Sequence, residues 1–366
     1  MEIFLLIVAL VYLILHGYLL FGLTESINLS YDEKQLPFVS VIIAARNEKD
    51  NIRKCIKSLK ELKYNKDLYE IILVNDKSTD NTKELMLNAA GKDSNFVIID
   101  SNDSETSNLK GKANAIDTGI QIAKGDIILT SDADCEIPPD WIFETAKYYD
   151  KNTAMVCGFT NIKFTDSFFF KLQALDWVYL LSLASGSTGI NKTLSCIGNN
   201  LSFRKSAYNE VGGYAGIEFS VTEDFALMRA IYKLKKYKIK YPVNYKSVVW
   251  TEACKDLKTL YKQKKRWFKG GLKINMLGYL MGLELYLMNL TLVFGLFILD
   301  PLIYLTLILI KIFSELLLIL PVIFRLKLKN LLPYYFFYEI YFAFYGLLLP
   351  FSFIFGGTID WKGRKF

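Results

Sequence analysis

The chain has 366 residues, of which 52% are hydrophobic, and it carries a formal net charge of +7. This apolar content is high for a soluble enzyme and directs attention first to membrane-spanning segments. The single histidine, His16, lies inside an apolar run, which excludes a Ser-His-Asp triad and a histidine-bound zinc ion in a soluble domain. The five cysteines fit no zinc-binding spacing, and we expect buried thiols in a reducing compartment.

The first apolar segment predicts a membrane anchor. Residues Ile3 to Leu23 are almost wholly apolar, close to the length of about 20 residues that a helix needs to cross a bilayer. The segment lacks the basic start and the cleavage site of a signal peptide, so we expect it to be retained. Lysines follow it, which indicates a soluble part in the cytoplasm of a bacterial-type plasma membrane protein. Because the basic residues flank apolar segments, the charge favours anionic lipids and phosphate-bearing ligands over nucleic acid.

Residues 38–158 alternate between short apolar runs typical of buried strands and amphipathic runs typical of helices. The expected strands cover residues 38–45, 69–75, 96–100 and 126–131, and the expected helices cover residues 48–62, 79–90 and 112–123. Asn47 is expected to cap the first of these helices. The alternation predicts an α/β fold with a parallel sheet covered on both faces. In such sheets ligands bind beyond the carboxyl ends of the strands.

The second half of this domain carries an apolar stripe at helical spacing. Its members are Phe170, Ala174, Trp177, Val178 and Leu181, which fall on one arc clear of Lys171, Gln173 and Asp176. Such a stripe predicts a core face. The aromatic residues at 168–170 leave contact with a membrane surface open.

The C-terminal third is again apolar. Leu257–Lys273 interleaves lysines with large apolar residues, which predicts a helix lying along a membrane interface. Leu283–Phe324 is long enough for two membrane spans, broken at Asp300-Pro301. Pro333–Phe355 is a further apolar stretch, and Trp361–Phe366 is a basic tail. The number of spans and the side of the C-terminus stay open, because the span count and the charge of the tail favour opposite sides.

Carboxylates follow two of the expected strands. Asp76 comes directly after the second strand, where it can accept hydrogen bonds from a base or ribose, although Asp also commonly begins a turn. Asp132 and Asp134 flank Ala133 after the fourth strand, and this alternation can give the two carboxylates different tasks. Oxygen ligands suit Mg²⁺ or Mn²⁺, which can bridge a diphosphate while keeping bound waters.

Two further motifs each have a chemical and a structural interpretation. Asp224, after Thr222 and Glu223, can accept a proton from an attacking hydroxyl group, or the three residues can simply open a helix. Arg266 and Trp267, at helical spacing from Gln263, can hold a departing pyrophosphate and offer a flat surface for a sugar. The same residues also fit an interfacial basic helix.

Together these residues resemble the membrane-bound members of glycosyltransferase family 2, over about residues 38–275. The order of the motifs along the chain is what makes the resemblance specific. In the family's order, the motifs are Val41–Glu48, Asn75-Asp76, Lys110–Ala113, Asp132–Asp134, Gly198–Arg204, Thr222–Asp224 and Gln263–Trp267. The Q-x-x-R-W motif is shared with ceramide glucosyltransferase-like and poly-N-acetylglucosamine or hyaluronan synthase-like enzymes, which the pattern resembles most.

The resemblance implies a GT-A fold, in which a Rossmann-like, mostly parallel sheet forms a cytoplasmic α/β domain with transmembrane helices before and after it. It also implies a UDP-sugar donor, a divalent cation (Mn²⁺ or Mg²⁺) and a single displacement that inverts the anomeric centre. The implied nucleotide-sugar ligands are Ala45, Glu48, Asp76, Lys112, Asp132 and Glu223, with Asp134 holding the metal. The implied catalytic residues are Asp224 as the general base and Gln263, Arg266 and Trp267 at the pyrophosphate and acceptor.

The expected domains are a transmembrane anchor (1–24), a GT-A catalytic domain (25–255), an amphipathic interface helix with the Q-x-x-R-W motif (256–282) and a C-terminal transmembrane region with a basic tail (283–366). That tail contains Trp361-Lys-Gly-Arg364. It resembles a terminal W-x-G-R element of lipid glycosyltransferases, which implies that Arg364 contacts the donor phosphates.

The motifs do not identify the acceptor, so we turn to the C-terminal apolar segments. We favour transfer of one sugar to a membrane lipid or lipid-linked acceptor, because the C-terminal spans are few and strongly apolar. Lys311, Glu315 and Glu339 are the exceptions, and Lys311 can pair with Glu315 at helical spacing. A processive polysaccharide synthase that exports its polymer is the alternative, and an inactive membrane scaffold fits less well because the carboxylates are all retained. The identity of the sugar and the oligomeric state stay open.

Overall fold

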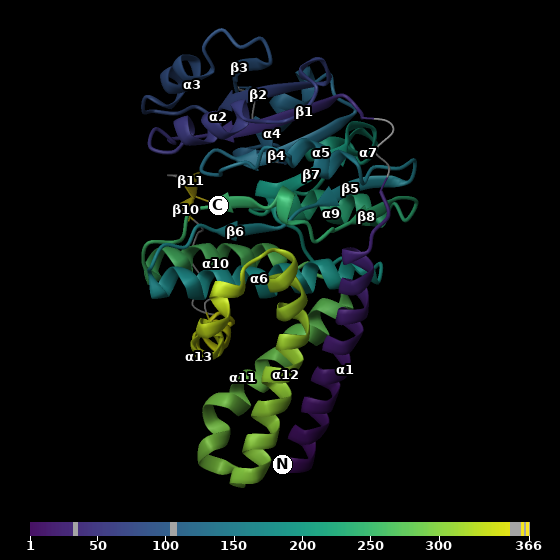
Figure 1. The fold of residues 1–366 in the computed structure, drawn as a ribbon, viewed down its shortest axis with the longest axis vertical. Coiled ribbons are helices and arrows are strands. Elements are labelled where there is room, and N and C mark those ends of the chain that lie inside the picture. The colour runs from purple at the N-terminus through teal and green to yellow at the C-terminus, as the bar shows by residue number, and fades with distance from the viewer. Residues whose placement is uncertain (32–35, 103–107, 352–359, 362–363, 366) are drawn as a thin grey trace. The chain divides into compact units, whose positions relative to one another are not determined.

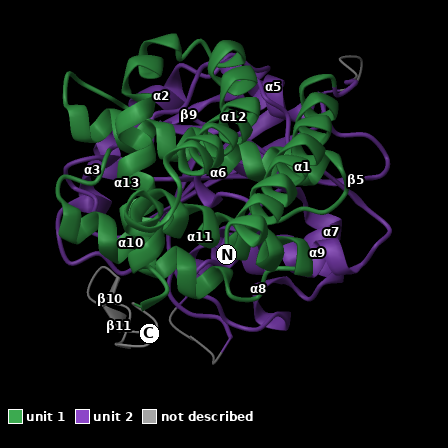
Figure 2. Cartoon of the chain, turned by 90° about the horizontal axis from the view of Figure 1, so that it is seen from below, with its two compact units in different colours: residues 1–28, 162–195, 253–357 green, residues 29–161, 196–252, 358–366 purple. Residues whose placement is uncertain are grey.

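The computed structural model describes residues 1–31, 36–102 and 108–351, together with 360–361 and 364–365. The chain forms two compact units, and each is assembled from separated stretches of sequence. We call residues 1–28, 162–195 and 253–357 the helical unit, and residues 29–161, 196–252 and 358–366 the sheet unit (Figure 2). The expected domain of residues 25–255 therefore contains a segment, 162–195, that folds with the apolar helices.

The sheet unit is built on seven strands. Their bounds are β1 (Val39–Ala45), β2 (Tyr69–Asn75), β3 (Phe96–Asp100), β4 (Ile127–Asp132), β5 (Thr153–Cys157), β7 (Leu201–Arg204) and β8 (Lys238–Lys240). They lie in the order β3-β2-β1-β4-β7-β5-β8. The first four are parallel to one another, and β7 is antiparallel to both of its neighbours (Figure 1). The expected mostly parallel sheet is confirmed.

Helices cover both faces of this sheet, because successive strand side chains point to opposite sides. On one face, α2 (Ile52–Lys60), α3 (Thr82–Ala90) and α5 (Trp141–Ala146) share a core with β1 and β2. On the other face lies α4 (Lys112–Ile122), where a Cβ on Gly119 would lie 2.8 Å from Ile42 of β1. The glycine thus lets this helix approach the sheet closely.

The remaining elements of the sheet unit are short. They are the helices α7 (Lys205–Glu210), α8 (Gly213–Gly216) and α9 (Glu223–Lys233), the 3-10 turns η1 (Lys66–Leu68), η2 (Gly198–Asn200) and η3 (Tyr245–Ser247), and two small ladders. One ladder pairs β6 (Thr160–Ile162) with β9 (Val249–Thr251), and the other pairs β10 (Asp360–Trp361) with β11 (Arg364–Lys365).

The first helix of the sheet unit begins later than the sequence indicates. It begins at Ile52, so the expected start at Glu48 and the expected cap Asn47 are wrong. Asn47 has a positive φ of 53°, and its side-chain oxygen accepts a hydrogen bond from the backbone of Thr79 (2.8 Å). The preceding loop is therefore bound to a second loop rather than wound into the helix.

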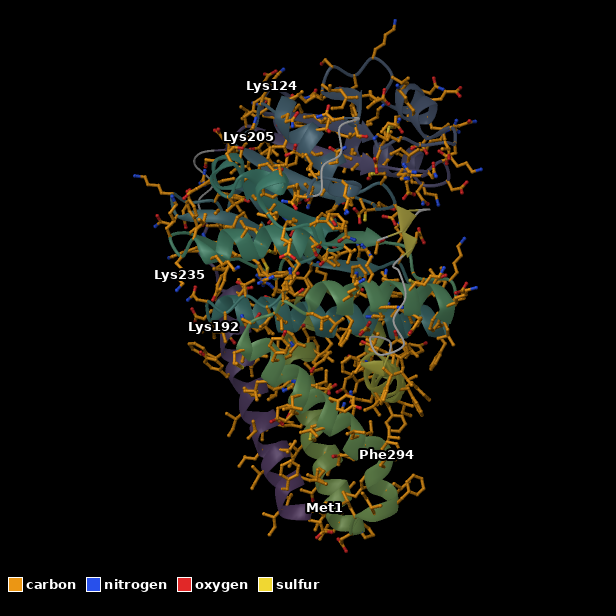
Figure 3. The ribbon with its side chains drawn as sticks, turned by 180° about the vertical axis from the view of Figure 1, so that it is seen from behind. Met1, Lys124, Lys192, Lys205, Lys235 and Phe294 are labelled. Atoms are coloured by element: carbon orange, nitrogen blue, oxygen red, sulfur yellow. The ribbon has the colours of Figure 1, made fainter. Side chains whose placement is uncertain are left out.

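In its described residues the helical unit contains six helices of more than two turns. They are α1 (Glu2–Ile27), α6 (Phe168–Gly189), α10 (Leu257–Gly271), α11 (Met276–Ile298), α12 (Pro301–Arg325) and α13 (Tyr335–Leu348), with η4 (Lys329–Tyr334) before the last. Among the described residues, α1, α11 and α12 are long and apolar enough to cross a membrane. Large apolar side chains project outward from them, as Phe294 of α11 does (Figure 3), and lipid is the solvent that such a surface suits. The 14 residues of α13 are fewer than the roughly 20 that a span needs.

Two helix ends in this unit follow from capping. Asp300 accepts hydrogen bonds from the backbone of Leu302 (2.9 Å) and Ile303 (3.3 Å), so α12 begins at Pro301 as expected. The expected interface helix over residues 256–282 is instead two helices, because α10 ends at Gly271 and α11 begins at Met276. Asn275 caps this second start by accepting from the backbone of Gly278 (3.1 Å).

Helix α6 is buried on more than its apolar stripe. Ala174, Trp177 and Val178 are buried, which confirms the expected core face. Gln173 and Asp176, interpreted from the sequence as lying outside that face, are also buried, at 1% and 0% exposure. The polar side of this helix is therefore an internal surface of the helical unit, and its polar groups need partners.

Candidate active site

Three of the expected site residues meet at the carboxyl edge of the parallel strands. In the strand register Ala45 pairs with Asn75, and Ala44 pairs with Asp132. The backbone of Asp76 donates a hydrogen bond to the carbonyl oxygen of Ala45 (2.8 Å). Ala45, Asp76 and Asp132 thus lie at one edge of the sheet, where ligands of open α/β sheets bind.

The loops that follow β1 and β2 are bound to each other. The guanidinium of Arg46 donates to the backbone oxygens of Asp76 (2.9 Å) and Lys77 (3.1 Å). The backbone of Glu48 donates to the hydroxyl of Thr82 (2.8 Å). Glu48 and Asp76 are both buried, at 7% and 2% exposure. This pair of loops places two expected nucleotide ligands in a fixed frame.

Lys112 joins two of the expected carboxylates. Its ammonium nitrogen lies 2.7 Å from Oδ1 of Asp132 and 2.9 Å from Oε1 of Glu223. Burial lowers the pKa of Lys112, but the charges of Asp132 and Glu223 outweigh burial and raise it above its ordinary value. The lysine therefore stays charged and ties the first residue of α4 to the end of β4 and the start of α9.

Asp224, the expected base, lies beside the turn η2. Its Oδ1 accepts from the backbone of Phe225 (2.8 Å), and a Cβ on Gly198 would lie 3.0 Å from its Oδ2. The next residue of the turn is tied to β4, because Ser131 donates to the carbonyl oxygen of Asn199 (2.7 Å). In the described part of the chain Thr222 makes no side-chain capping bond to α9, so the carboxylate is held without that cap.

Asp132 and Asp134 offer the carboxylate oxygens that a hard cation prefers as ligands, and two thiols lie beside them. Burial first, and then the charges of Asp134 and Asp132, raise the pKa of the Cys55 thiol. Cys135 also lies beside Asp134, with its sulfur 3.6 Å from Oδ1. Within the described ranges, His, Cys, Asp and Glu side chains form no group of three or more that could enclose a metal. Mg²⁺ and Mn²⁺ commonly use one or two carboxylates plus substrate phosphates, so the carboxylates of Asp132 and Asp134, rather than the thiols, fit such an ion.

Gln263, Arg266 and Trp267 lie on α10 and belong to the helical unit, and all three are half-buried. The ring of Trp267 meets the ring of Trp177 edge to face, with centroids 5.4 Å apart. Lys264, inside the same motif, is only 4% exposed. The helix is therefore more than a solvated basic face, because one of its lysines points into the unit.

Two buried charges near this motif were missed from the sequence. Asp176 forms an ion pair with Lys264, although the two residues lie 88 positions apart. The available signal was a lone carboxylate inside a largely apolar helix, which has to find a partner when it is buried.

Arg364 lies in β11, and its side chain is outside the described part of the chain.

Sequence comparisons give the relatives of this chain. Residues 40–224 match the family model described as glycosyl transferase family 2. The poly-beta-1,6-N-acetyl-D-glucosamine synthase of Staphylococcus aureus is 30% identical over 266 residues, which is 70% of this chain and 61% of the relative. The synthase of the same name from Staphylococcus epidermidis is 28% identical over 251 residues, 68% of this chain and 58% of the relative. The chain thus spans about three fifths of the length of these curated relatives.

A solved structure shares the fold. A mannosyltransferase from Pyrobaculum calidifontis, in complex with GDP-Man and Mn²⁺, superposes with a TM-score of 0.58. The sequences are 17% identical, and the match covers 96% of this chain and 99% of the other. At this identity the likeness concerns the fold alone, and it confirms the expected GT-A architecture.

Proposed function

This chain belongs to glycosyl transferase family 2, and we propose that it is a membrane-bound enzyme that transfers a sugar from a UDP-sugar to a membrane lipid or lipid-linked acceptor. The observation that carries the proposal is the ion-pair group of Lys112, Asp132 and Glu223. It connects the carboxyl end of the parallel strands to the helix that bears Asp224, as a site for donor and acceptor chemistry requires.

In this proposal the sheet unit binds the UDP-sugar donor. Ala45, Glu48 and Asp76 bind the nucleoside, and the buried carboxylates accept hydrogen bonds from its base and ribose. Lys112 binds the phosphates, with Asp132 and Glu223 orienting it. Asp134 holds Mn²⁺ or Mg²⁺, which when bound supplies positive charge to the diphosphate.

The transfer step is a single displacement. The acceptor hydroxyl oxygen bonds to the anomeric carbon while the bond from that carbon to the UDP oxygen breaks, and UDP leaves with the electron pair. Asp224 accepts the hydroxyl proton, a contribution of about a hundred- to ten-thousand-fold in rate. Arg266 stabilises the leaving diphosphate, and Gln263 and Trp267 position the acceptor. Attack opposite the leaving group inverts the anomeric centre.

The membrane provides the acceptor in this proposal. By the positive-inside rule, the lysines that follow α1 support a cytoplasmic location for the sheet unit. The charges expected inside the C-terminal helices are paired with one another, because Lys311 lies 2.7 Å from Glu315 and is also bonded to Glu339. Paired charges packed within the helical unit favour single transfer over a polar conduit for a polymer. Nucleic acid has no role in the proposed activity.

A polysaccharide synthase is the second candidate. It is favoured by the two Staphylococcus relatives, which are named as polysaccharide synthases and are 30% and 28% identical to this chain. In that case the donor is UDP-N-acetylglucosamine and the acceptor is the growing polymer. The chemistry at Asp224 is the same in both candidates, so the product distinguishes them.

The deciding experiment measures UDP release by the purified protein in detergent with Mn²⁺ and a panel of UDP-sugars, with and without a total lipid extract. Release that needs the lipid and yields one discrete glycolipid supports transfer to a membrane acceptor. Release without lipid, with a product of growing mass, supports the polymer synthase instead. If none of the donors is consumed under either condition, the proposed activity is wrong.

A further inference from the structure

Helix α6 carries a carboxylate whose two oxygens are both bonded to other helices. Asp176 is completely buried. Its Oδ2 pairs with the ammonium of Lys264 on α10, and its Oδ1 accepts from the hydroxyl of Tyr345 on α13. One buried side chain therefore joins three helices of the helical unit, which Figure 1 labels.

The neighbours of Asp176 on the same face of α6 extend this contact to α10 and the segment before it. Gln173, three residues earlier, donates to the carbonyl oxygen of Cys254 (2.9 Å) and accepts from its backbone nitrogen (3.0 Å). Trp177, one residue later, meets the ring of Trp267 edge to face at 5.4 Å. Gln173 lies three residues from Asp176 and four from Trp177. Because residues at these spacings share a helix face, the contacts form one continuous strip.

Lys264 lies inside the Q-x-x-R-W motif, so its position constrains the motif's other members. Its ammonium lies 4.7 Å from the ring centroid of Trp267 and 5.0 Å from that of Tyr345. The lysine is 4% exposed, and separation from Asp176 would leave a buried charge without its partner. Rotation of α10 about its axis is therefore opposed at the turn that carries Arg266 and Trp267.

An apolar pair of similar size at these positions would stabilise the fold as well as, or better than, a buried ion pair. A charged pair differs in that it tolerates few geometries, since both partners must keep their hydrogen bonds. A buried charged pair at this position therefore suits a helix, α10, that has to keep one defined orientation.

We propose that Asp176 is a positioning residue: through Lys264 it fixes the rotation of α10 and hence the orientation of Gln263, Arg266 and Trp267. The inference rests on the proposed function of that motif. Asp176 itself touches neither substrate in this proposal. Its loss is expected to slow transfer while donor affinity, which depends on the sheet unit, stays unchanged.

The first test compares Asp176→Asn with the wild-type chain by hydrogen–deuterium exchange, in detergent and without substrate. Peptides that cover α10 are expected to exchange about tenfold faster, because the lysine loses its counter-ion. Peptides from the sheet unit are expected to keep their wild-type rates. The matched control is Lys171→Met on the same helix, whose lysine donates to the hydroxyl of Tyr334 (2.9 Å) and not to α10.

The second readout is the kinetics of UDP release. A small misplacement of a catalytic group costs up to about a hundredfold in rate, so kcat of Asp176→Asn is expected to fall roughly ten- to hundredfold with KM for the donor unchanged. If the wild-type protein showed no transferase activity, the proposed function would be refuted. The exchange experiment would still test the orientation of α10, because it needs no activity.

The double variant Asp176→Asn/Lys264→Met separates orientation from stability, because it leaves no unpaired charge. We expect it to unfold at the wild-type temperature and still to turn over slowly. The proposal would be overturned if α10 of Asp176→Asn exchanged at the wild-type rate. It would also be overturned if the double variant turned over at the wild-type rate. Failure of both variants to accumulate as folded protein would also overturn it, since the pair would then serve folding and not orientation.

Discussion

The ammonium nitrogen of Lys112 lies 2.7 Å from Oδ1 of Asp132, where helix α4 begins and strand β4 ends. The same nitrogen lies 2.9 Å from Oε1 of Glu223, so one positive charge is shared between two carboxylates and offsets them in part. Without the lysine, both carboxylates would present uncompensated negative charge to an approaching diphosphate, whereas with it one of the two charges is offset. The lysine is therefore expected to lower the electrostatic cost of bringing a diphosphate to this edge of the sheet.

Replacement of Lys112 by Met removes the proposed charge contact to the UDP phosphates. Loss of such a contact costs more than about 1.4 kcal/mol of binding free energy, so UDP binding is expected to weaken by about tenfold or more. Isothermal titration with UDP measures this loss. The matched control is Lys110→Met, because Lys110 lies 4.4 Å from the ring centroid of Phe219. UDP affinity equal to that of the wild-type chain in Lys112→Met would show that the lysine does not contact the phosphates.

Replacement of Asp224 by Asn keeps the shape of the side chain and removes the proton acceptor. Turnover is expected to fall by about a hundred- to ten-thousand-fold while UDP binds as it does to the wild-type chain. Single-turnover UDP release together with titration separates the two quantities. Glu210→Gln, which breaks an exposed 2.6 Å ion pair with Lys236, is a control that is expected to leave both unchanged. Wild-type turnover in Asp224→Asn would assign the base to another residue.

Removal of the divalent ion tests the assignment of Asp134. UDP-sugar binding by the wild-type chain is expected to weaken in EDTA and to recover with Mn²⁺ or Mg²⁺, whereas Asp134→Ala is expected to show no response to either ion. The comparison of the two ions also identifies the preferred one. Asp126→Asn, just before the opposite end of β4, is the matched control and should respond like the wild-type chain. Metal-stimulated binding by Asp134→Ala would contradict the assignment.

The strands could be predicted because their signal is local. The bounds of β2 and β3 match the expected ranges 69–75 and 96–100, since each is a short run rich in apolar residues between polar or turn residues. The start of α2 could not be predicted, because Asn47 is engaged by Thr79 on another loop. A cap and a loop-to-loop contact use the same side-chain oxygen, and only the fold determines which one forms.

The motifs of the proposed site were visible from the sequence, whereas the residues that support them were not. Asp224 and Arg266 belong to short patterns in a defined order, but the partners of Asp176 lie 88 and 169 positions away along the chain. A carboxylate in an apolar helix shows that some partner is needed. It does not show which of the many lysines and tyrosines supplies the bond, because that depends on how three helices pack.

The crossing of α1 and α6 rests on glycines, and this yields a prediction about stability. A Cβ on Gly22 would lie 2.0 Å from the carbonyl oxygen of Gly186, and one on Gly189 would lie 1.8 Å from that of Gly22. No real side chain fits at such distances, so the two backbones are in direct contact. Small residues permit this close approach in apolar helix pairs, where van der Waals contact is the main attraction.

Gly22→Ala is therefore expected to force α1 and α6 apart and to destabilise the helical unit by about 1–3 kcal/mol, the usual cost of overpacking. The midpoint of thermal unfolding in detergent measures this change. Gly17→Ala on the same helix is the matched control, because a Cβ there would meet no described atom within 4 Å. Since alanine favours a helix more than glycine does, the control should unfold at or above the wild-type temperature. Equal midpoints for the two variants would mean that the close crossing does not hold α1 against α6.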